Sequence, residues 1–534
     1  MKRFFFNLCL SASICGLLNS ANAAPPAVTF VHPAGAQRGT SVEITAAGTL
    51  DANTKFAASD KSLSLEPTKT AGKFKLTVAN DAVPGTYWLR AHNAEGASAL
   101  RPFIVGTLPD VTEKEPNDEY RKAQVIERTA VVVNGKLEKN GDVDCYAVKL
   151  KKGETLVASL EAHHTLRSPM DSMLQVLSAD GFVLEENNDY RGLDPQIAFT
   201  AKSDGNYVVR VYAFPATPDA SIRYFGSDAC VYRLTLTTGP FADFALPPAV
   251  WPEGGARPPL ELRGWNIGRG HVSVRSPADD PLVTVFCDDL ANVVRGTRER
   301  HRVFIQADAP LAPPFSFGGT LTAKRGEARV PLAGKKGQVL ALEVRSRSFG
   351  LTVNPVVALL DKDGKQLTRA EPAKLNGDTT IPVFVLPADG MYTVAVSDLY
   401  GGGGTARDYF LLRVLSEPDY ELSVTTDRLT VVSGKPTLVP VTITRFRAFA
   451  DAVEVSAEGL PDGVKAEVVK DAKPLPNLIT LSLTAEKPVS GAFRVLGTVR
   501  TKPQYERAAR APLADFETNT AQLWLTAVQD EKKK

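Results

Sequence analysis

The sequence predicts an all-β protein made of tandem β-sandwich modules, and three features carry this prediction. Short runs rich in Val, Leu and Thr alternate with turn residues along most of the chain, a pattern typical of many short strands. Glycine (40) and proline (37) are frequent and dispersed, and apolar stripes at helical spacing are scarce. A hydrophobic content of 43% over 534 residues indicates a globular chain, long enough for about three to five domains.

The N-terminal residues have the pattern of a secretory signal peptide. Lys2 and Arg3 precede a largely apolar run over 4–18, and Ala21-Asn22-Ala23 offers a small-x-small cleavage pattern. The apolar run is too short for a spanning helix, and no second apolar stretch follows it. We therefore expect cleavage before Ala24 and an exported protein, periplasmic or extracellular, with no membrane span.

The remaining chain divides into five expected modules, an immunoglobulin-like type alternating with a jelly-roll-like type. Residues 85–90, Gly-Thr-Tyr-Trp-Leu-Arg, resemble the late strand of immunoglobulin-like modules of the IPT/TIG kind, which serve mostly as spacers or docking surfaces. The expected boundaries are 1–23 for the signal peptide, 24–107, 108–240, 241–306, 307–416 and 417–528 for the first to fifth modules, and 529–534 for a solvated tail.

An acidic run in the second module is the strongest candidate for a binding site. Pro116 restricts Glu115 to an extended backbone, and side chains alternate along an extended segment. Hard cations such as calcium take about six to eight oxygen ligands, several of them carboxylates. Spacing alone leaves a solvated acidic linker as an equal alternative. The oxygen-bearing candidates are Glu113, Glu115, Asn117 and Asp118, then Asp142 and Asp144 about two dozen residues later.

Three ordered motifs in the second module resemble the bacterial pre-peptidase C-terminal domain. They are Glu-x-Glu-Pro-Asn-Asp at 113–118, Gly-Asp-x-Asp at 141–144 and Asp-Gly-Asn-Tyr at 204–207. The resemblance covers about 108–240 and implies a non-catalytic β-sandwich, appended to secreted peptidases and related to the collagen-binding domains of bacterial collagenases. It also implies calcium as the bound ion, with Asp142 the least certain of the ligands Glu113, Glu115, Asn117, Asp118, Asp142 and Asp144.

The fourth module reads as a second copy of the second, and this repeat supplies an internal comparison. Lys335-Lys336-Gly337 matches Lys151-Lys152-Gly153, and Asp389-Gly390-Met391-Tyr392 matches Asp204-Gly205-Asn206-Tyr207. The acidic run is not repeated: Gly326-Glu327-Ala328-Arg329 stands where Gly-Asp-x-Asp is expected. We therefore expect calcium in the second module only. A similar echo links the third module to the first, because 252–257 resembles 33–38.

The cysteines and histidines give no sign of a disulfide framework or a metal centre. Three cysteines follow the signal peptide, and the strand pattern turns Cys145 outward and Cys230 inward, which leaves a bridge between them an open alternative. His163-His164 has no partner at ligand spacing, and we expect His92 to be a surface residue.

No catalytic motif is present, so we expect a protein that is not an enzyme. The sequence holds no Gly-x-Ser-x-Gly, His-Glu-x-x-His or Cys-x-x-Cys pattern, and a formal net charge of +2 argues against nucleic acid as a partner. Two interpretations remain. The first is a secreted binding or adhesion protein for an extracellular protein or polysaccharide. The second is an enzyme-associated protein, which is either an accessory subunit of an exported peptidase or hydrolase or an enzyme with an unrecognised site. Exposed aromatic residues would favour binding, whereas ordinary packing is the alternative for Tyr212, Phe214, Tyr224 and Phe225.

Overall fold

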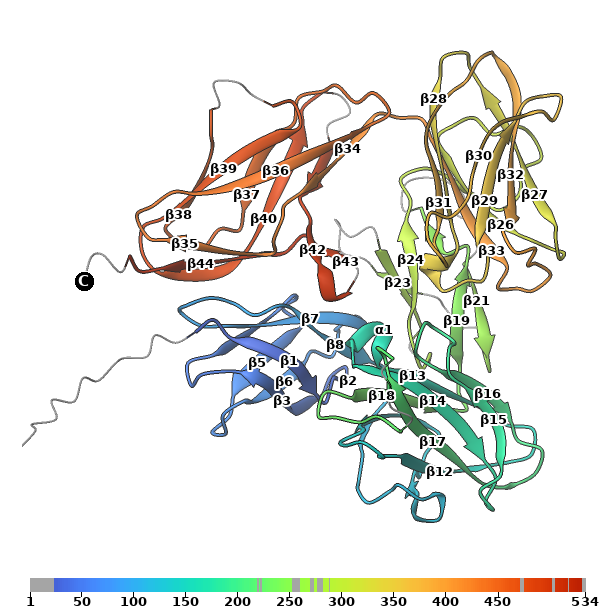
Figure 1. Cartoon of the computed structure of the whole chain (residues 1–534), viewed down its shortest axis with the longest axis vertical. Coiled ribbons are helices and arrows are strands. Elements are labelled where there is room, and N and C mark those ends of the chain that lie inside the picture. The colour runs from blue at the N-terminus through green and yellow to red at the C-terminus, as the bar shows by residue number, and fades with distance from the viewer. Residues whose placement is uncertain are drawn as a thin grey trace, which may run out of the picture.

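The chain folds almost entirely into β-strands, which pack as pairs of sheets along consecutive stretches of sequence (Figure 1). The all-β, tandem-sandwich prediction is therefore confirmed. The predicted signal peptide and the 252–257 echo lie outside the described residues. The computed structural model describes residues 24–218, 220, 223–251, 260–268, 273–275, 282–287, 289–470, 475–501, 505–516 and 518–530.

The first module is a sandwich of two four-stranded sheets, ordered β1-β3-β6-β5 and β2-β8-β7-β4. Alternation along the strands turns Ile44, Leu76 and Leu89 into its core, where none is exposed to solvent. Its strands are β1 (Ala27–His32), β2 (Gly35–Gln37), β3 (Ser41–Thr49), β4 (Lys55–Ala58), β5 (Leu63–Pro67), β6 (Lys73–Val78), β7 (Gly85–His92) and β8 (Arg101–Gly106).

The second module packs two five-stranded sheets, ordered β10-β12-β17-β14-β15 and β16-β13-β18-β11-β9. Tyr146, Val148 and Leu150 point from β12 into the core between them, as the alternation predicts. Its elements are β9 (Asp110–Thr112), η1 (Tyr120–Lys122), β10 (Gln124–Val125), β11 (Ala130–Lys136), β12 (Asp144–Leu150), β13 (Thr155–Glu161), α1 (His163–Leu166), β14 (Met170–Leu177), β15 (Val183–Asn187), β16 (Gln196–Thr200), β17 (Gly205–Pro215) and β18 (Val231–Thr237).

The third module is smaller and lies between the second and the fourth (Figure 1). Its strands form the sheets β19-β21 and β20-β24-β23-β22. Phe241 packs toward Val157 of the second module, and Phe244 packs against Leu351 and Tyr409 of the fourth. The strands are β19 (Phe241–Leu246), β20 (Ala249–Val250), β21 (Glu261–Trp265), β22 (Ser273–Arg275), β23 (Leu282–Phe286) and β24 (Val294–Arg298).

The fourth module has the sheets β25-β26-β33-β28-β31 and β27-β32-β29-β30. Its core includes Leu332, Leu342 and Phe410, none of them exposed to solvent. The elements are β25 (Val303–Phe304), β26 (Phe315–Thr320), β27 (Glu327–Gly334), β28 (Val339–Arg345), η2 (Arg347–Phe349), β29 (Pro355–Leu360), β30 (Gln366–Ala370), β31 (Thr379–Val385), β32 (Gly390–Asp398) and β33 (Tyr409–Leu415).

The second and fourth modules have the same strand order, as a duplication predicts. The sheet β16-β13-β18-β11-β9 corresponds to β31-β28-β33-β26-β25, and β12-β17-β14-β15 corresponds to β27-β32-β29-β30. The side chains agree as well. The hydroxyl groups of Tyr207 and Tyr392 donate to the carbonyl oxygens of Ser203 and Ala388, four residues earlier, at 2.9 and 2.7 Å.

The fifth module has the sheets β34-β36-β39-β38 and β35-β44-β40-β37, with β41 paired to β40 and a separate β42-β43 pair. Its core includes Tyr420, Val441 and Phe493. The elements are β34 (Asp419–Ser423), β35 (Arg428–Val432), β36 (Thr437–Phe446), β37 (Glu454–Glu458), β38 (Val464–Val468), β39 (Leu478–Ala485), β40 (Val489–Val499), β41 (Tyr505–Ala508), β42 (Ala511–Leu513), η3 (Ala514–Phe516), β43 (Thr518–Thr520) and β44 (Leu523–Val528).

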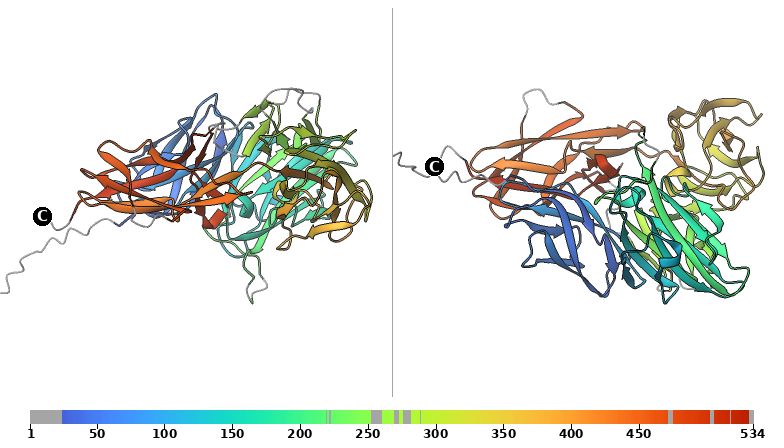
Figure 2. Two further views of the ribbon diagram at one scale, coloured as in Figure 1. Left: turned by 90° about the horizontal axis from the view of Figure 1, so that it is seen from above. Right: turned by 60° about the horizontal axis from the view of Figure 1, so that its bottom comes forward.

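The first and fifth modules lie against each other, so the arrangement of modules closes on itself (Figure 2). Arg90 and Asp427 form an ion pair at 2.6 Å, with side chains only 4% and 7% exposed. Beside it, the rings of His92 and Trp524 are 4.7 Å apart. We call this contact the clasp, and it shows that His92, expected at the surface, packs between modules.

Candidate metal centre

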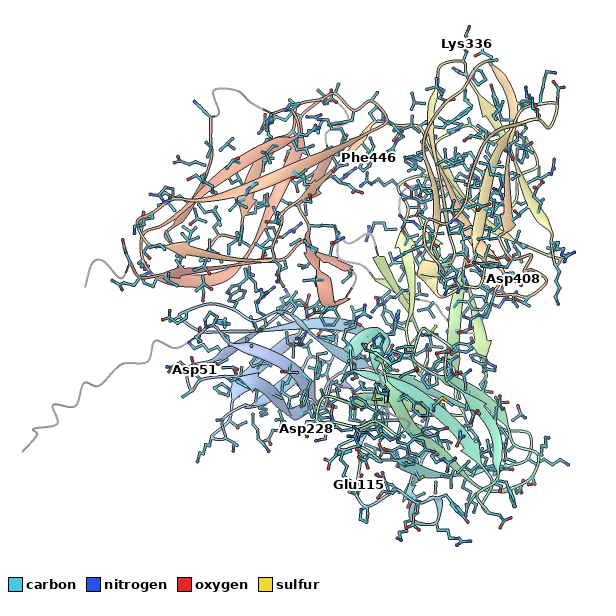
Figure 3. All side chains as sticks on the ribbon, viewed as in Figure 1. Asp51, Glu115, Asp228, Lys336, Asp408 and Phe446 are labelled. Carbon is cyan, nitrogen blue, oxygen red and sulfur yellow. The ribbon has the colours of Figure 1, made fainter. Side chains whose placement is uncertain are left out.

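The predicted acidic residues come together where the segment after β9 meets the start of β12. Glu113 follows β9 and is half-buried, Asn117 is wholly buried, and Asp144 opens β12 with no exposed surface. The backbone N–H of Cys145 donates to the carbonyl oxygen of Asn117 at 3.1 Å, which fastens the two segments together. Glu115 lies at the surface of the module, where Figure 3 labels it.

Three carboxylates form the centre of this cluster. Glu113, Glu115 and Asp144 each place one oxygen within 4.8 Å of the others, the spacing needed to hold one metal ion. No histidine or cysteine joins them in the part of the chain that the structure describes. An all-oxygen donor set suits a hard cation such as calcium rather than zinc or copper.

The other three predicted residues surround this centre. The side-chain amide of Asn117 donates to Glu113 Oε1 at 3.4 Å. The carboxyl groups of Asp118 and Asp142 lie within hydrogen-bonding reach of each other. Asp142 also accepts the backbone N–H of Glu138 at 2.5 Å, which gives it a structural role in the turn before β12.

Two tyrosine hydroxyl groups, which the sequence did not predict, bind the carboxylates of the cluster from the core side of the module. Tyr232 of β18 donates to Asp144 Oδ2 at 2.5 Å, and its hydroxyl oxygen lies 2.5 Å from that of Tyr146 on β12. Tyr146 donates to Glu113 Oε1 at 3.2 Å. The sequence marks both as inward strand residues, but their meeting depends on how the two sheets of the sandwich pack, because β12 and β18 belong to different sheets.

Two buried acceptor atoms in the cluster have no donor. They are Asn117 Oδ1 and Asp144 Oδ1, and both residues are 0% exposed. A buried acceptor without a partner is destabilising, so nearly all such atoms in folded proteins are satisfied. A cation held by Glu113, Glu115 and Asp144 would give such an acceptor a partner. The residues therefore fit a bound hard cation.

Burial and mutual repulsion hold the carboxyl groups of Asp144, Asp142 and Glu115 toward their protonated forms. Burial, followed by the charge of Glu113, raises the pKa of Asp144 well above its ordinary value. Burial also raises the pKa of Asp142 and of Glu115. Removing charged groups from water disfavours their ionised form, and like charges nearby disfavour it further. A divalent cation would reverse both effects.

The fourth module has no counterpart of the acidic cluster. Tyr207 and Tyr392 occupy corresponding positions, and Asp144 pairs with Val211 whereas Ala328 pairs with Val396. Asp144 therefore corresponds to Ala328, one position before the Arg329 that the sequence motif indicated. The same register matches Tyr146 with Val330 and Tyr232 with Phe410. The residues that correspond to Asp144, Tyr146 and Tyr232 are thus all apolar.

The structure also shows how the cysteines and the aromatic candidates of the second module are placed. Cys145 and Cys230 are buried and form no disulfide, because Cys145 points away from the core of the module and Cys230 points into it, as the strand pattern predicted.

Among the aromatic candidates, Tyr212 is packed, with 7% of its surface exposed, whereas Tyr224 is 40% exposed. The two rings lie 4.6 Å apart and Phe214 packs at their edges, so packing and exposure both occur in this group.

None of the helices in the described ranges is long and apolar enough to cross a membrane.

Several solved structures are similar to this chain at low sequence identity and low TM-score. The eight N-terminal Ig domains of Down Syndrome Cell Adhesion Molecule are 10% identical, with a TM-score of 0.16, 92% of this chain covered and 48% of that chain. The S-layer protein SbsC is 11% identical, with a TM-score of 0.14 and coverages of 91% and 54%. The chain thus spans about half the length of each.

A third similar structure is SGBP-B of the Bacteroides ovatus mixed-linkage glucan utilization locus, in complex with a mixed-linkage heptasaccharide. It is 9% identical, with a TM-score of 0.13, and the match covers 68% of this chain and 70% of that one. These TM-scores are too low to indicate a common overall architecture.

Sequence comparison with whole proteins and with families gives one positive result. No curated protein sequence matches the chain. Residues 142–213, which run from Asp142 of the acidic cluster to β17, match the family model of the bacterial pre-peptidase C-terminal domain.

Proposed function

We propose that this chain is an exported, non-catalytic binding or adhesion protein whose second module is stabilised by calcium. One observation carries the calcium part of the proposal. The second module buries two acceptor oxygens, on Asn117 and Asp144, that have no donor and that border three converging carboxylates. The family match at 142–213 supports the same module type.

Calcium is the ion that best fits the compartment as well as the ligands. Extracellular modules bind calcium with dissociation constants of about 10⁻⁴–10⁻³ M, which suits a site outside the cell. At ten times the dissociation constant, binding to the folded state alone adds about 1.4 kcal/mol of stability. The bound ion neutralises the repulsion among Glu113, Glu115 and Asp144, and this contributes to the stabilisation.

Thermal unfolding of the chain from Ala24 onward, with calcium or with chelator, tests this proposal. We expect calcium to raise the melting temperature, and Glu115→Gln with Asp144→Asn to abolish the rise. Glu327→Gln is the matched control, because Glu327 is an exposed carboxylate at the start of β27 in the fourth module. The proposal fails if calcium gives no rise, or if the control removes the rise equally.

We further propose that the protein is exported and does not catalyse hydrolysis. The signal-peptide pattern and the lack of a catalytic motif support this. Intact mass of the exported form should correspond to a chain that begins at Ala24. Screening against protein and polysaccharide substrates should show no turnover that a single carboxylate or histidine substitution removes.

The family description supports a second candidate, an accessory partner of an exported peptidase. A pull-down of exported proteins and cell-wall polymers on the purified chain distinguishes the two. Recovery of a peptidase whose turnover changes on binding would favour the accessory role, whereas retention of a polymer would favour the binding role.

A further inference from the structure

The clasp joins two faces that are separate from the cores of their own modules. In the first module Trp88, Arg90 and His92 alternate along β7 with residues of the core, so they lie on the outer face of its sheet. The strand β7 lies inside that sheet, between β8 and β4. The clasp therefore forms at the middle of a sheet face and not at a sheet edge.

The fifth module covers this face with outward residues of its own. Trp524 lies between two core residues of β44, so it points away from the core of its module. Its ring packs against that of His92, and the guanidinium carbon of Arg90 lies 6.0 Å from its centre. The ring of Trp88 packs against Phe516 in the same contact. Tryptophan and arginine at the centre of a contact are typical of specific protein interfaces.

One buried ion pair makes the contact selective. The guanidinium of Arg90 donates to Asp427 at 2.6 Å and to the carbonyl oxygen of Ser98 at 2.8 Å. Both charged side chains are almost wholly buried in the clasp. Reversing either charge would place two like charges together out of water, which is strongly unfavourable. The clasp therefore requires complementary charges on its two faces.

The fifth module is joined to the rest of the chain by a short polar connection. Residues 416–418 connect β33 to β34. Arg300 of the third module pairs with Asp419 at 2.9 Å, and His301 Nε2 lies 3.8 Å from Glu417. Among the described residues, no apolar cluster contains members of both the fourth and the fifth modules. Exposed ion pairs stabilise weakly, so the fifth module can turn at this joint as a unit once the clasp opens.

We propose that the clasp is also a self-association surface, through which the first module of one copy binds the fifth module of a second copy. The structure shows the occupant of each face, and every copy carries both faces. Two opened chains can therefore exchange their ends and form two clasps in a closed dimer, which rising protein concentration favours. This inference goes beyond the calcium-stabilised binding role, because it concerns the first and fifth modules and names a second copy of the chain as a partner.

Exchange of the two charges, followed by sedimentation velocity on the chain from Ala24 onward, tests the proposal. Arg90→Asp and Asp427→Arg should each open the clasp and give a more extended monomer. The double variant restores an opposite-charge pair within one chain and should sediment like the closed wild type.

An equimolar mixture of the two single variants should form dimers, because one dimer then contains one exchanged ion pair and one original ion pair. We expect the dimer fraction of the mixture to exceed that of either variant alone about tenfold or more. Equal dimer formation by one variant alone would overturn the proposal, because that variant lacks complementary charges.

The matched control uses Lys73 and Glu43, an exposed ion pair at 2.8 Å in the other sheet of the first module. Mixing Lys73→Glu with Glu43→Lys brings together the same opposite changes in net charge and should leave both proteins monomeric. Dimers in this control would attribute association to net charge and would overturn the proposal.

A monomeric mixture with a closed double variant would also overturn it, because the clasp would then form only within one chain. If the double variant stays open, wild type decides: it should form a dimer that increases with concentration and that Trp88→Ala weakens. Wild type that stays monomeric up to its solubility limit would then reject the proposal. The calcium-dependent melting shift should persist in all variants, so this result is distinguishable from failure of the proposed function.

Discussion

The second and fourth modules share one strand order but differ in the residues at the centre of the sandwich. In both, an aromatic ring packs against a glycine. Tyr232 of β18 packs against Gly135, and Phe410 of β33 packs against Gly319. In the second module that ring carries a hydroxyl group that binds Asp144, and the fourth module has Phe410 and Ala328 instead. The fold therefore does not require the acidic cluster.

The comparison teaches that the cluster is an addition to the sandwich and not part of its framework. A carboxylate such as Asp144 is tolerated in a buried position only with hydrogen bonds and a compensating charge. The fourth module has an apolar centre at the same place and has no carboxylate to neutralise. Three sets of measurements test how far this equivalence extends.

The largest effect is expected for the two glycines. A Cβ on Gly135 would lie 2.2 Å from Tyr232 Cζ, and one on Gly319 would lie 2.5 Å from Phe410 Cζ. Gly135→Ala and Gly319→Ala should each destabilise the chain by about 3 kcal/mol, because a packed ring cannot move aside. Urea denaturation measures both. If one substitution were neutral, the two rings would not be equivalent.

A smaller effect is expected when the two aromatic residues are exchanged. Phe410→Tyr would bury a hydroxyl without a partner and should cost about 2 kcal/mol. Tyr232→Phe removes the donor to Asp144 and should weaken calcium binding, which titration by calorimetry measures. Stabilisation by Phe410→Tyr would mean that the fourth module keeps a hidden polar partner.

The smallest effect concerns pH. Because the pKa of Asp144 is raised on folding, the folded state holds this proton more tightly than the unfolded chain. Its contribution to stability is complete below the ordinary carboxyl pKa of about 4 and is lost as pH rises through the raised value. A tenfold difference in proton affinity between the folded and unfolded states corresponds to about 1.4 kcal/mol of stability.

In chelator, wild-type protein should therefore gain stability relative to Asp144→Asn when the pH is lowered from about 7 toward 5. Urea midpoints for the two proteins at each pH measure the difference. The calcium-induced gain should shrink over the same range, because protons compete with the ion for its ligands. A pH-independent difference would contradict the raised pKa.

Much of the second module could be predicted because its signals are local. Alternating residues predict that Cys145 faces outward and Cys230 inward, and the acidic motifs include the three carboxylates that the structure brings together. The tyrosine hydroxyl groups could not be predicted. Tyr146 and Tyr232 read as ordinary inward residues, and only the packing of the two sheets against each other brings together the hydroxyl groups of these residues, 86 positions apart.

Contacts between modules were equally invisible in the sequence. His92 has no partner nearby in the chain, and its contact with Trp524 arises because the first and fifth modules meet. Arg90 and Asp427 are separated by 337 positions, and neither has a local pattern that marks it as buried. Burial of a charged side chain is rare, so periodicity gives no reason to expect it.

The clasp also determines how the chain would respond to a pulling force. Trp88 of β7 packs edge-on against Phe516 of the fifth module, with ring centroids 4.9 Å apart, beside the Arg90–Asp427 pair. Tension applied between residues 24 and 530 would pass through this contact as well as through the modules in between. Opening of the clasp would separate the first and fifth modules without unfolding either sandwich, because its contacts lie between the modules.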